Sequence, residues 1–271
     1  MTTVTNGDDV RDADDARARE ALSQLDVDLH LRDPALKQRF VTPLFDLIAP
    51  RYDRFTAVFS FGMDRRWKRS LLSEVEGKLH PGARVLDLAC GTGDIALALA
   101  RGTPAAEIMG IDASARMIAA AEKRRGRAGP AASRMRFEVG DMMRLGAADS
   151  SVDLVTAGYA LRNAPDAGAV LREIRRVLKP GGHLATLDFY CPEPSLWRAL
   201  YLGYLSVAGN AIGWLWHRQP VVYGYIARSL EGWMSWREMS REMEGAGFEV
   251  RRVREWLLGG IAVHVAESVR E

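Results

Sequence analysis

The chain has 271 residues, of which 48% are apolar and 27% charged, and its net charge is only +2. A chain of this length can bury one sizeable core but is short for two enzyme domains, so we expect one principal domain. Lysines and arginines are spread along the chain, so the charge pattern does not favour nucleic acid as a partner. The two cysteines, Cys90 and Cys191, offer no cluster of metal ligands, and residues 1–30 lack the apolar segment of a secretory signal. We expect a cytoplasmic protein without a metal site.

Composition divides the chain into a tail and one domain. Residues 1–35 are polar and mostly acidic, which predicts a mobile tail, and 36–271 form the single domain. Within that domain, the aromatic segment 36–80 predicts a helical cap before the sheet. The segment 191–233 is long for a connection and rich in aromatic residues, which indicates a lid or a substrate wall.

Residues 199–216 contain no charged side chain, and this length is near the lower limit for a membrane span. Three glycines and Asn210 interrupt the apolar run, and Arg198 and Arg218 bracket it. We therefore expect a buried or interfacial helix pair, and a true span is the disfavoured alternative.

From residue 84 onward, short apolar runs alternate with helical segments, a pattern typical of a parallel sheet with crossover helices. The predicted strands are 84–88, 107–111, 135–139, 152–157 and 183–189, and the predicted helices are 94–101, 115–125, 167–178 and 235–246. Residues 248–254 and 261–268 flank Gly259 and Gly260 and predict two antiparallel strands at one edge. The predicted fold is a doubly wound α/β fold with a seven-stranded, mostly parallel sheet and an antiparallel edge hairpin.

A glycine-rich turn from Asp87 to Asp94 joins the first predicted strand to the first predicted helix. Gly91 and Gly93 would let a ligand approach the backbone where the amides of a helix N-terminus converge. The turn also fits the dinucleotide fingerprint, because Asp112 follows Gly91 by 21 positions, where an acid that binds ribose is expected. The motif alone therefore leaves NAD and S-adenosylmethionine open.

Acidic residues at the strand ends favour the second cofactor. Asp87 at the end of strand one would attract the cationic amino group of a methionine moiety but repel a pyrophosphate. Asp112 at the end of strand two would accept both ribose hydroxyls. After strand three, Asp141 could take the exocyclic amine of an adenine and Met142 could cover its face. Three acids at successive strand ends predict one crevice.

Some of these residues have simpler interpretations. Asp94 and Asp141 also suit helix caps or turns. Cys90, close to a helix start, could be an activated thiol, but a small residue filling a tight turn is the favoured interpretation.

Several longer segments are more specific. The segments VLDLACGTGDIALALA, GIDAS with Met117, YALRNAPD and LREIRRVLKPGGHLATLDFYCP resemble the ubiquinone/menaquinone biosynthesis C-methyltransferase family. The upstream segment FDLIAPRYDRFTAVFSFGMDRRWKRSLL is similar to that family's N-terminal signature, and the likeness runs from about Phe40 to Val269. The resemblance implies a Rossmann-like methyltransferase that uses S-adenosylmethionine.

The resemblance also implies a set of site residues. It implies that Thr92, Asp112, Asp141 and Met142 contact the cofactor, and it puts Gly158 where family members often carry serine. Together with the turn, the expected cofactor-binding residues are Asp87, Ala89, Gly91, Thr92, Gly93, Asp112, Ala113, Met117, Asp141, Met142 and Gly158.

The expected catalytic residues are Arg162, Asn163 and Tyr52, which the family's pattern implies at the reaction centre. A fixed guanidinium at Arg162 would stabilise a phenolate as it forms, while Asn163 and Tyr52 would position the acceptor. A helix cap or a surface ion pair is the alternative role for Arg162.

The expected reaction is C-methylation of a quinol-like aromatic ring that belongs to a hydrophobic small molecule. Departures from the family's pattern around Phe55-Thr56-Ala57 and Leu145-Gly146-Ala147 affect the exact substrate more than methyl transfer itself. O- or N-methylation of another hydrophobic metabolite, a noncatalytic subunit of a biosynthetic complex and an NAD-dependent oxidoreductase are the alternatives. The lid aromatics would suit an apolar tunnel and a peripheral contact with a membrane, or else a local core. A homodimer stays open.

Overall fold

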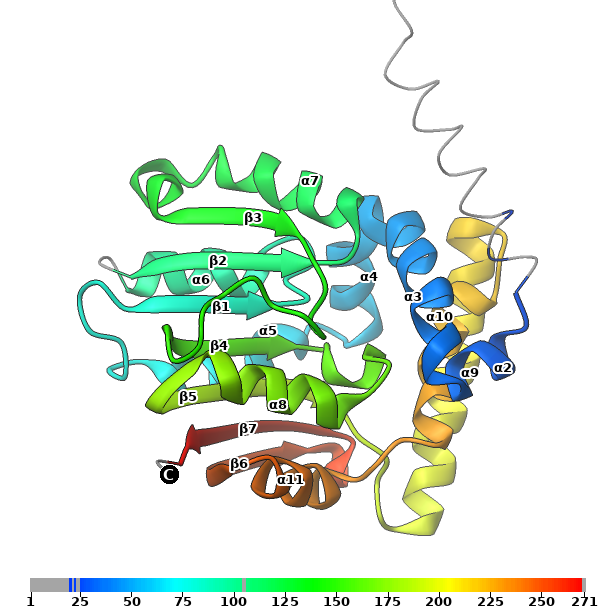
Figure 1. Cartoon of the computed structure of the whole chain (residues 1–271). Coiled ribbons are helices and arrows are strands. Elements are labelled where there is room, and N and C mark those ends of the chain that lie inside the picture. The colour runs from blue at the N-terminus through cyan, green and yellow to red at the C-terminus, as the bar shows by residue number, and fades with distance from the viewer. Residues whose placement is uncertain (1–19, 21, 23–24, 104–105, 270–271) are drawn as a thin grey trace, which may run out of the picture.

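The computed structural model describes residues 20, 22, 25–103 and 106–269. Figure 1 shows a twisted sheet with helices on both faces and a further group of helices beyond one end of the strands. Most of the predicted tail lies outside the described residues. Its last part forms helix α2 (Val27–Arg32), which begins after Asp26, whose carboxylate accepts the N–H groups of Asp28 and Leu29.

The sheet has seven strands in the order β3-β2-β1-β4-β5-β7-β6. In chain order they are β1 (Arg84–Leu88), β2 (Glu107–Asp112), β3 (Met135–Val139), β4 (Val152–Gly158), β5 (Leu178–Phe189), β6 (Phe248–Trp256) and β7 (Ile261–Ser268). Strands β1 to β5 pair in parallel, and β7 is antiparallel to both β5 and β6. The predicted fold class is confirmed, although β5 begins at Leu178, earlier than the predicted start at His183.

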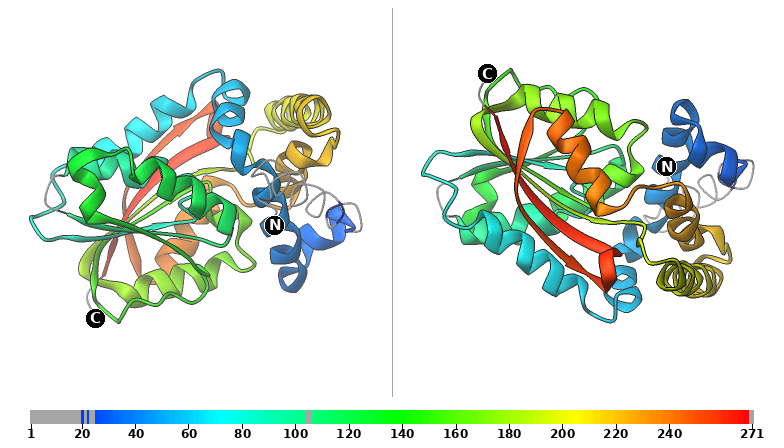
Figure 2. Two further views of the ribbon diagram at one scale, coloured as in Figure 1. Left: turned by 90° about the horizontal axis from the view of Figure 1, so that it is seen from above. Right: turned by 90° about the horizontal axis from the view of Figure 1, so that it is seen from below.

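Helices cover both faces of the sheet, as Figure 2 shows from above and below. The helices of one face are α5 (Asp64–Val75), α6 (Asp94–Gly102) and α7 (Ala115–Arg125), and those of the other face are α8 (Ala167–Val177) and α11 (Trp236–Gly245). Trp67, Leu97 and Ile118 belong to the core on the first face, and Ile174 and Met239 to the core on the second. The N-termini of α7 and α11 are capped by the hydroxyls of Ser114 and Ser235.

A third core lies beyond the carboxyl ends of the parallel strands. Its helices are α3 (Pro34–Ile48), η1 (Ala49–Arg51), α4 (Tyr52–Phe59), α9 (Ser195–His217) and α10 (Val221–Glu231). Phe40, Leu44 and Tyr223 are completely buried there. The predicted lid and residues 36–59 of the predicted N-terminal cap thus pack against each other and cover the end of the sheet where ligands bind in open α/β folds. Helix α5, in the rest of the predicted cap, lies on a face of the sheet instead.

Helices α9 and α10 approach each other closely at glycines. A Cβ on Gly209 would lie 2.7 Å from the carbonyl oxygen of Tyr223, and one on Gly213 would lie 2.7 Å from that of Gln219. Only glycine permits this approach of two backbones. Residues 199–216, expected to form a helix pair, lie instead within the single helix α9, and the glycines of this run let α10, which follows it, pack closely against it. Within the described part of the chain, no helix is long and apolar enough to cross a membrane.

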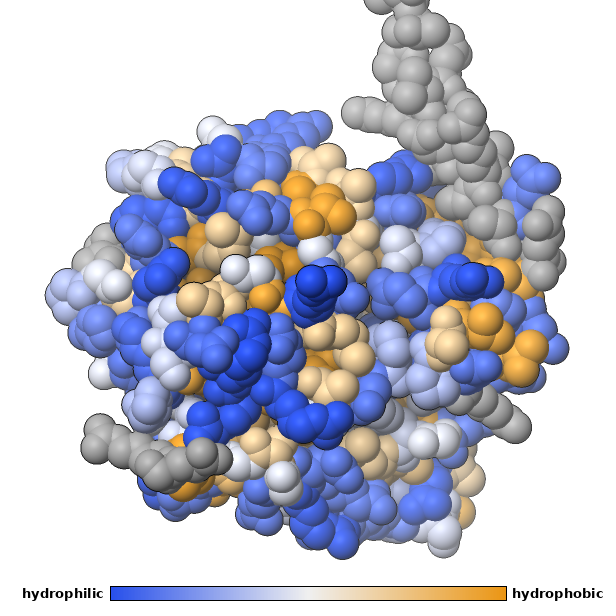
Figure 3. All heavy atoms as spheres, in the orientation of Figure 1, coloured by the Kyte–Doolittle hydropathy of each residue, from blue (hydrophilic) through white to orange (hydrophobic). Residues whose placement is uncertain are grey.

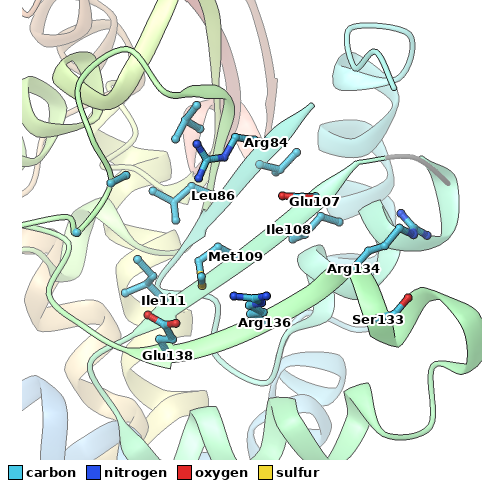
Figure 4. A pocket seen from close by; sticks show the side chains of 14 residues that line it. Arg84, Leu86, Glu107, Ile108, Met109, Ile111, Ser133, Arg134, Arg136 and Glu138 are labelled. Carbon is cyan, nitrogen blue, oxygen red and sulfur yellow. The ribbon is translucent and has the colours of Figure 1, made fainter. Parts of the chain in front are cut away.

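The remaining described helical turns are η2 (Gly129–Arg134), η3 (Leu161–Asn163) and η4 (Leu257–Gly259). The connection from β3 to β4, residues 140–151, contains no helix, so part of the sheet face over β1, β2 and β3 is open. A pocket of about 400 Å³ lies there, and Figure 4 shows Leu86, Met109 and Ile111 on its floor with Arg84 and Glu138 among its charged side chains. Figure 3 shows that this side of the molecule is mostly hydrophilic. Because its lining includes residues from the strand starts, this pocket is not the crevice predicted at the strand ends.

Candidate active site

The glycine turn follows β1 and adopts left-handed backbone at Ala89, Gly91 and Gly93, with φ values of 48°, 54° and 81°. A Cβ on Gly93 would lie 2.9 Å from the ring of Phe137, so this position also needs glycine for packing. The turn then starts α6, whose first residue is Asp94.

Asp112 at the end of β2 is tied to this turn. Its Oδ2 accepts the N–H of Gly91 at 2.8 Å, and its Oδ1 accepts the N–H of Ser114 at 2.8 Å. Burial raises the pKa of Asp112, and these two backbone hydrogen bonds oppose the shift. The carboxylate is therefore held in a fixed orientation between two strand ends.

A cavity of about 50 Å³, here called the turn cavity, opens beside Asp112. Its lining contains many of the residues predicted from the sequence, namely Tyr52, Ala89, Gly91, Asp112, Ala113, Met117, Met142, Gly158 and Asn163. Helix α3 contributes Gln38, Val41, Thr42 and Phe45 to the same wall. The structure thus brings together the ends of β1, β2 and β4 under a cover formed by α3.

Asp87 does not line the turn cavity. Its side chain is 1% exposed and lies under α6, where Oδ2 accepts the N–H of Ala96 at 3.1 Å and Oδ1 accepts the hydroxyl of Thr156 at 2.7 Å. Burial raises the pKa of Asp87 to about 7, against the effect of these hydrogen bonds. The role expected for Asp87, a direct partner of a methionine amino group, therefore does not match the direction of its side chain.

Three other predicted residues also lie outside the turn cavity. Gly93 packs against Phe137, as described above. The Thr92 hydroxyl donates to Oδ1 of Asp53 at 2.6 Å and accepts from Arg124 at 2.8 Å. Asp141 is exposed, and its Oδ1 accepts the N–H of Met143 at 2.8 Å, which is the turn role considered as its alternative.

Arg162 lies in an adjacent cavity, here called the aromatic cavity, which shares Phe45, Tyr52, Tyr159 and Asn163 with the turn cavity. Its guanidinium stands 5.6 Å from the ring centre of Phe189 and 5.5 Å from that of Tyr225. It also donates to the hydroxyl of Ser229. With 2% exposure, Arg162 is a buried cation among aromatic rings.

Asn163 and Tyr52 stand in the wall between the two cavities. The Asn163 amide donates to the carbonyl of Tyr159 at 3.0 Å, while its buried Oδ1 has no hydrogen-bond partner within the described part of the protein. Burial raises the pKa of Tyr52 well above its usual value, so this phenol stays neutral. An unpaired acceptor and a neutral phenol thus adjoin both cavities.

A third hollow, here called the outer pocket, continues from the aromatic cavity and has a volume of about 310 Å³. The two share Phe59, Ser60, Trp67 and Phe189. The other side chains of the outer pocket are Phe61, Met63, Trp197, Leu200, Tyr201, Tyr204, Leu205 and Leu257. Phe61 and Leu200 are 77% and 60% exposed, so the series of cavities reaches the surface.

Sequence reasoning missed several residues of this site. The α3 residues Gln38, Val41, Thr42 and Phe45 follow a helical spacing that could have indicated one face of a helix. Lys37 is 9% exposed, and burial and the charge of Arg162 lower its pKa to about 8. Asp188, which pairs with Arg162, and Asp64, which pairs with Tyr159, lie far from their partners along the chain, so no local pattern signals them.

This sheet order, with a glycine turn and a strand-end carboxylate at one apolar cavity, defines the class of Rossmann-like, S-adenosylmethionine-dependent methyltransferases. The chain belongs to the ubiE/COQ5 methyltransferase family, whose model matches residues 34–268.

Named relatives agree with this assignment. The chain is 35% identical to a demethylmenaquinone methyltransferase of Lactiplantibacillus plantarum, over 83% of this chain and 94% of that protein. It is 37% identical to the ubiquinone/menaquinone biosynthesis C-methyltransferase UbiE of Geotalea uraniireducens, over 84% of this chain and 96% of that protein.

Solved structures share the fold. A SAM-dependent methyltransferase from Aquifex aeolicus matches with a TM-score of 0.53 at 20% identity, covering 74% of this chain and 89% of that chain. A geranyl diphosphate C-methyltransferase from Streptomyces coelicolor matches with a TM-score of 0.57 at 16% identity, covering 76% of this chain and 79% of that chain.

Proposed function

We propose that the protein transfers a methyl group from S-adenosylmethionine to a ring carbon of a quinol that carries a long apolar tail. The observation that carries this proposal is the series of three adjoining cavities, which leads from Asp112 past Arg162 to the exposed Leu200. The names of the relatives, which include demethylmenaquinone methyltransferases, agree with an acceptor of this shape.

The residues of the turn cavity fit S-adenosylmethionine. Asp112 offers two carboxylate oxygens to ribose hydroxyls, and Met117 and Met142 offer apolar contacts. At Gly158 a Cβ would lie 2.5 Å from the terminal methyl group of Ile95, so glycine lets the end of β4 lie close to α6 there. The unpaired Oδ1 of Asn163 can accept a hydrogen bond from the cofactor's ammonium group or from an acceptor hydroxyl. When bound, the cofactor supplies an electrophilic methyl group.

The aromatic cavity would hold the ring of the acceptor. Its rings exclude water, and the guanidinium of Arg162 provides a fixed positive charge for a phenolate oxygen. Because arginine stays protonated, Arg162 stabilises the phenolate but does not remove the proton from the acceptor's hydroxyl group. Tyr52 and Asn163 stand where the two cavities meet and would align the ring carbon with the methyl group.

The test is a turnover assay with the purified chain, S-adenosylmethionine labelled on the methyl group, and reduced demethylated quinones with short and long tails. Mass spectrometry with fragmentation of the product reports whether the label is on a ring carbon, an oxygen or a nitrogen. A labelled ring carbon supports the proposal. Label on oxygen or nitrogen, or no product while S-adenosylhomocysteine binds, would overturn it in favour of another methyltransferase or a noncatalytic subunit.

We further propose that the outer face of α9 contacts a membrane. Leu196, Val207 and Leu215 on this helix are 75%, 72% and 63% exposed. Arg218 lies 5.0 Å from the ring of Trp214, which suits an arginine at the boundary between apolar tails and anionic headgroups. Because this face continues into the outer pocket through Leu200, a tail could pass from the bilayer into the protein.

Sedimentation with vesicles that contain anionic lipid tests this contact. The change of Val207 and Leu215 to Asp should reduce binding more than tenfold without changing turnover of a short-tailed acceptor in detergent. Glu231→Gln on α10 is the control. Unchanged binding of the double variant to vesicles would overturn the membrane contact. If the wild type is a dimer and the double variant is a monomer, the same face is an interface between two copies of the chain.

A further inference from the structure

Tyr159, directly after β4, lies in the wall shared by the turn cavity and the aromatic cavity. Its hydroxyl donates to Oδ1 of Asp64, at the start of α5, at 2.8 Å. Tyr159 is 9% exposed and Asp64 is 6% exposed. The phenol of Tyr159, beside the turn cavity and the aromatic cavity, is therefore hydrogen-bonded to a buried carboxylate.

The backbone of Tyr159 is strained. Its φ of 58° lies in the left-handed region, which is unfavourable for a residue other than glycine. The Tyr159 N–H donates to the carbonyl of Leu187 at 2.6 Å, which fastens this conformation to β5. Strain of this kind persists where the surrounding structure enforces it, and it concentrates at functional sites.

Asp64 is connected to the surface by a chain of ionic contacts. Lys68 lies one helical turn further along α5, and its Nζ is 3.0 Å from Asp64 Oδ2 and 3.0 Å from Asp94 Oδ2. Side-chain exposure rises along this chain, from 8% for Asp64 to 16% for Lys68 and 36% for Asp94. Arg124 pairs with Asp94 at the outer end. The contacts thus form a continuous polar path from the reactant cavities to solvent.

We propose that Tyr159 receives the hydroxyl proton of the acceptor and that Asp64, Lys68 and Asp94 carry a proton from Tyr159 to solvent. This assignment rests on the proposed function, since it requires an acceptor whose ring hydroxyl must ionise. It gives the reaction a proton acceptor that Arg162 cannot provide, because a guanidinium stays protonated.

The acceptor O–H bond breaks as its proton moves to the Tyr159 oxygen, while the Tyr159 proton moves to the Asp64 carboxylate. The electron pair left on the acceptor activates the ring carbon, which forms a bond to the methyl group as the sulfur–methyl bond breaks and its electron pair stays on sulfur. The ring proton then moves to the acceptor oxygen and restores the aromatic phenol. One proton, the one held by Asp64, leaves through Lys68 and Asp94.

The charges around the path suit this role. Burial and the nearby Asp64 raise the pKa of Tyr159 well above its usual value, and Tyr52 and Asp188 add to the effect. Tyr159 is therefore a neutral phenol before the reaction, and it accepts a proton only as it gives its own proton to Asp64. Burial opposes the charge of Lys68, but Asp64 and Asp94 together raise its pKa, so Lys68 is an ammonium that gives a proton to Asp94 as it takes one from Asp64. Burial also opposes the charge of Asp94, but the charges of Lys68 and Arg124 lower the pKa of Asp94, so Asp94 passes that proton on to solvent.

The experiment compares Tyr159→Phe and Asp64→Asn with the wild type over pH 6 to 10, on a demethylated quinol with a short tail. Both variants should lower kcat about tenfold to a hundredfold near pH 7. Their kcat should then recover as pH rises, because acceptor that ionises in solution no longer needs the path, while the wild type changes little. The double variant should be no slower than the slower single variant, since the two residues act as one unit.

Tyr190→Phe is the matched control, because Tyr190 is fully buried and hydrogen-bonded to His264 but lines neither cavity. It should keep the wild-type pH profile, and all variants should bind S-adenosylhomocysteine within about twofold of the wild type. Parallel pH profiles for the wild type, Tyr159→Phe and Asp64→Asn would mean that the hydrogen bond between Tyr159 and Asp64 is only structural. This result would overturn the proton path but leave the proposed function in place. Absence of wild-type turnover would overturn the proposed function and the path with it.

Discussion

Nε of Arg162 lies 3.8 Å from Oδ1 of Asp188, and neither side chain is more than 2% exposed. Oδ2 of Asp188 accepts the backbone N–H of Arg162 at 3.2 Å, so the acid holds both the main chain and the guanidinium. Burial raises the pKa of Asp188, and the positive charge of Arg162 opposes that shift. This pair fixes a cation in the aromatic cavity, where a phenolate would form.

Replacement of Arg162 by Ala should therefore have two effects. It removes the charge that stabilises the acceptor anion, which should lower kcat about a hundredfold. It also leaves Asp188 buried without a partner, and breaking a buried pair costs about 3–5 kcal/mol of stability. Single-turnover kinetics and thermal unfolding measure the two effects separately.

Arg162→Lys separates charge from packing. It keeps a cation near Asp188, so most of the stability should return, while kcat should stay well below the wild type because an ammonium group cannot reproduce the planar contacts with Phe189 and Tyr225. A single-turnover rate equal to the wild type in both variants would assign Arg162 a purely structural role.

Asp112→Asn should weaken binding of S-adenosylhomocysteine. An amide has a single acceptor oxygen, whereas the carboxylate of Asp112 has two, and both are already oriented by Gly91 and Ser114. The loss should be on the order of 2–3 kcal/mol, or about 30-fold to 150-fold in affinity, by isothermal titration. Asp153→Asn is the control, because Asp153 also accepts a backbone N–H, that of Arg84, but lies near the start of β4, at the edge of the sheet away from the turn cavity. Equal affinities for both variants would remove Asp112 from the cofactor site.

Asp87→Asn should change how stability depends on pH. The carboxyl group ionises at its ordinary pKa near 4 in the unfolded chain but at about 7 in the folded protein. Between these values the folded state binds more protons, so the stability contributed by Asp87 is lost as pH rises from about 4 to about 7. The loss amounts to about 1.4 kcal/mol for each unit of pKa difference. Urea unfolding should show the wild type losing stability relative to Asp87→Asn across this window, and a constant difference would contradict the raised pKa.

The sequence predicted what depends on local patterns. The strand ends, the glycine turn and the position of Asp112 follow from apolar runs, glycines and spacing within one β-α-β unit. The direction of the Asp87 side chain also follows from the strand pattern, because successive side chains of a strand point to opposite faces of the sheet. Leu86 and Leu88 belong to one core and Val85 to the other, so Asp87 points to the same face as Val85, where it lies under α6 and away from the turn cavity.

Contacts between distant segments were beyond local patterns. The pairing of Tyr159 with Asp64 joins residues 95 positions apart, and the lining from α3 depends on how the N-terminal helices dock against α10. The aromatic lid illustrates the same limit. Tyr223 and Tyr225 are buried against α3 and α4, whereas Trp214 is 54% exposed, so one pattern of residues serves both a core and a surface.

The outer pocket provides a last prediction, on the tail of the acceptor. Phe61 and Leu200 line this pocket and are largely exposed, so each can be changed to Ser without opening the core. Loss of apolar contact with a bound tail should cost about 1–2 kcal/mol, which corresponds to roughly a tenfold rise in KM. The rise should occur for a long-tailed quinol in detergent and not for a tail-less analogue.

A matched pair distinguishes the pocket from apolar surface in general. Leu196 and Leu215 lie on the same helix as Leu200 and are as exposed, but they do not line the outer pocket. Their change to Ser should leave both KM values unaltered in detergent, because the tail does not reach them. If Phe61→Ser with Leu200→Ser raises KM equally for the long-tailed and tail-less acceptors, the outer pocket affects the ring site only through the fold. An equal effect of Leu196→Ser with Leu215→Ser would instead show that the tail binds along the face of α9 and not in the outer pocket.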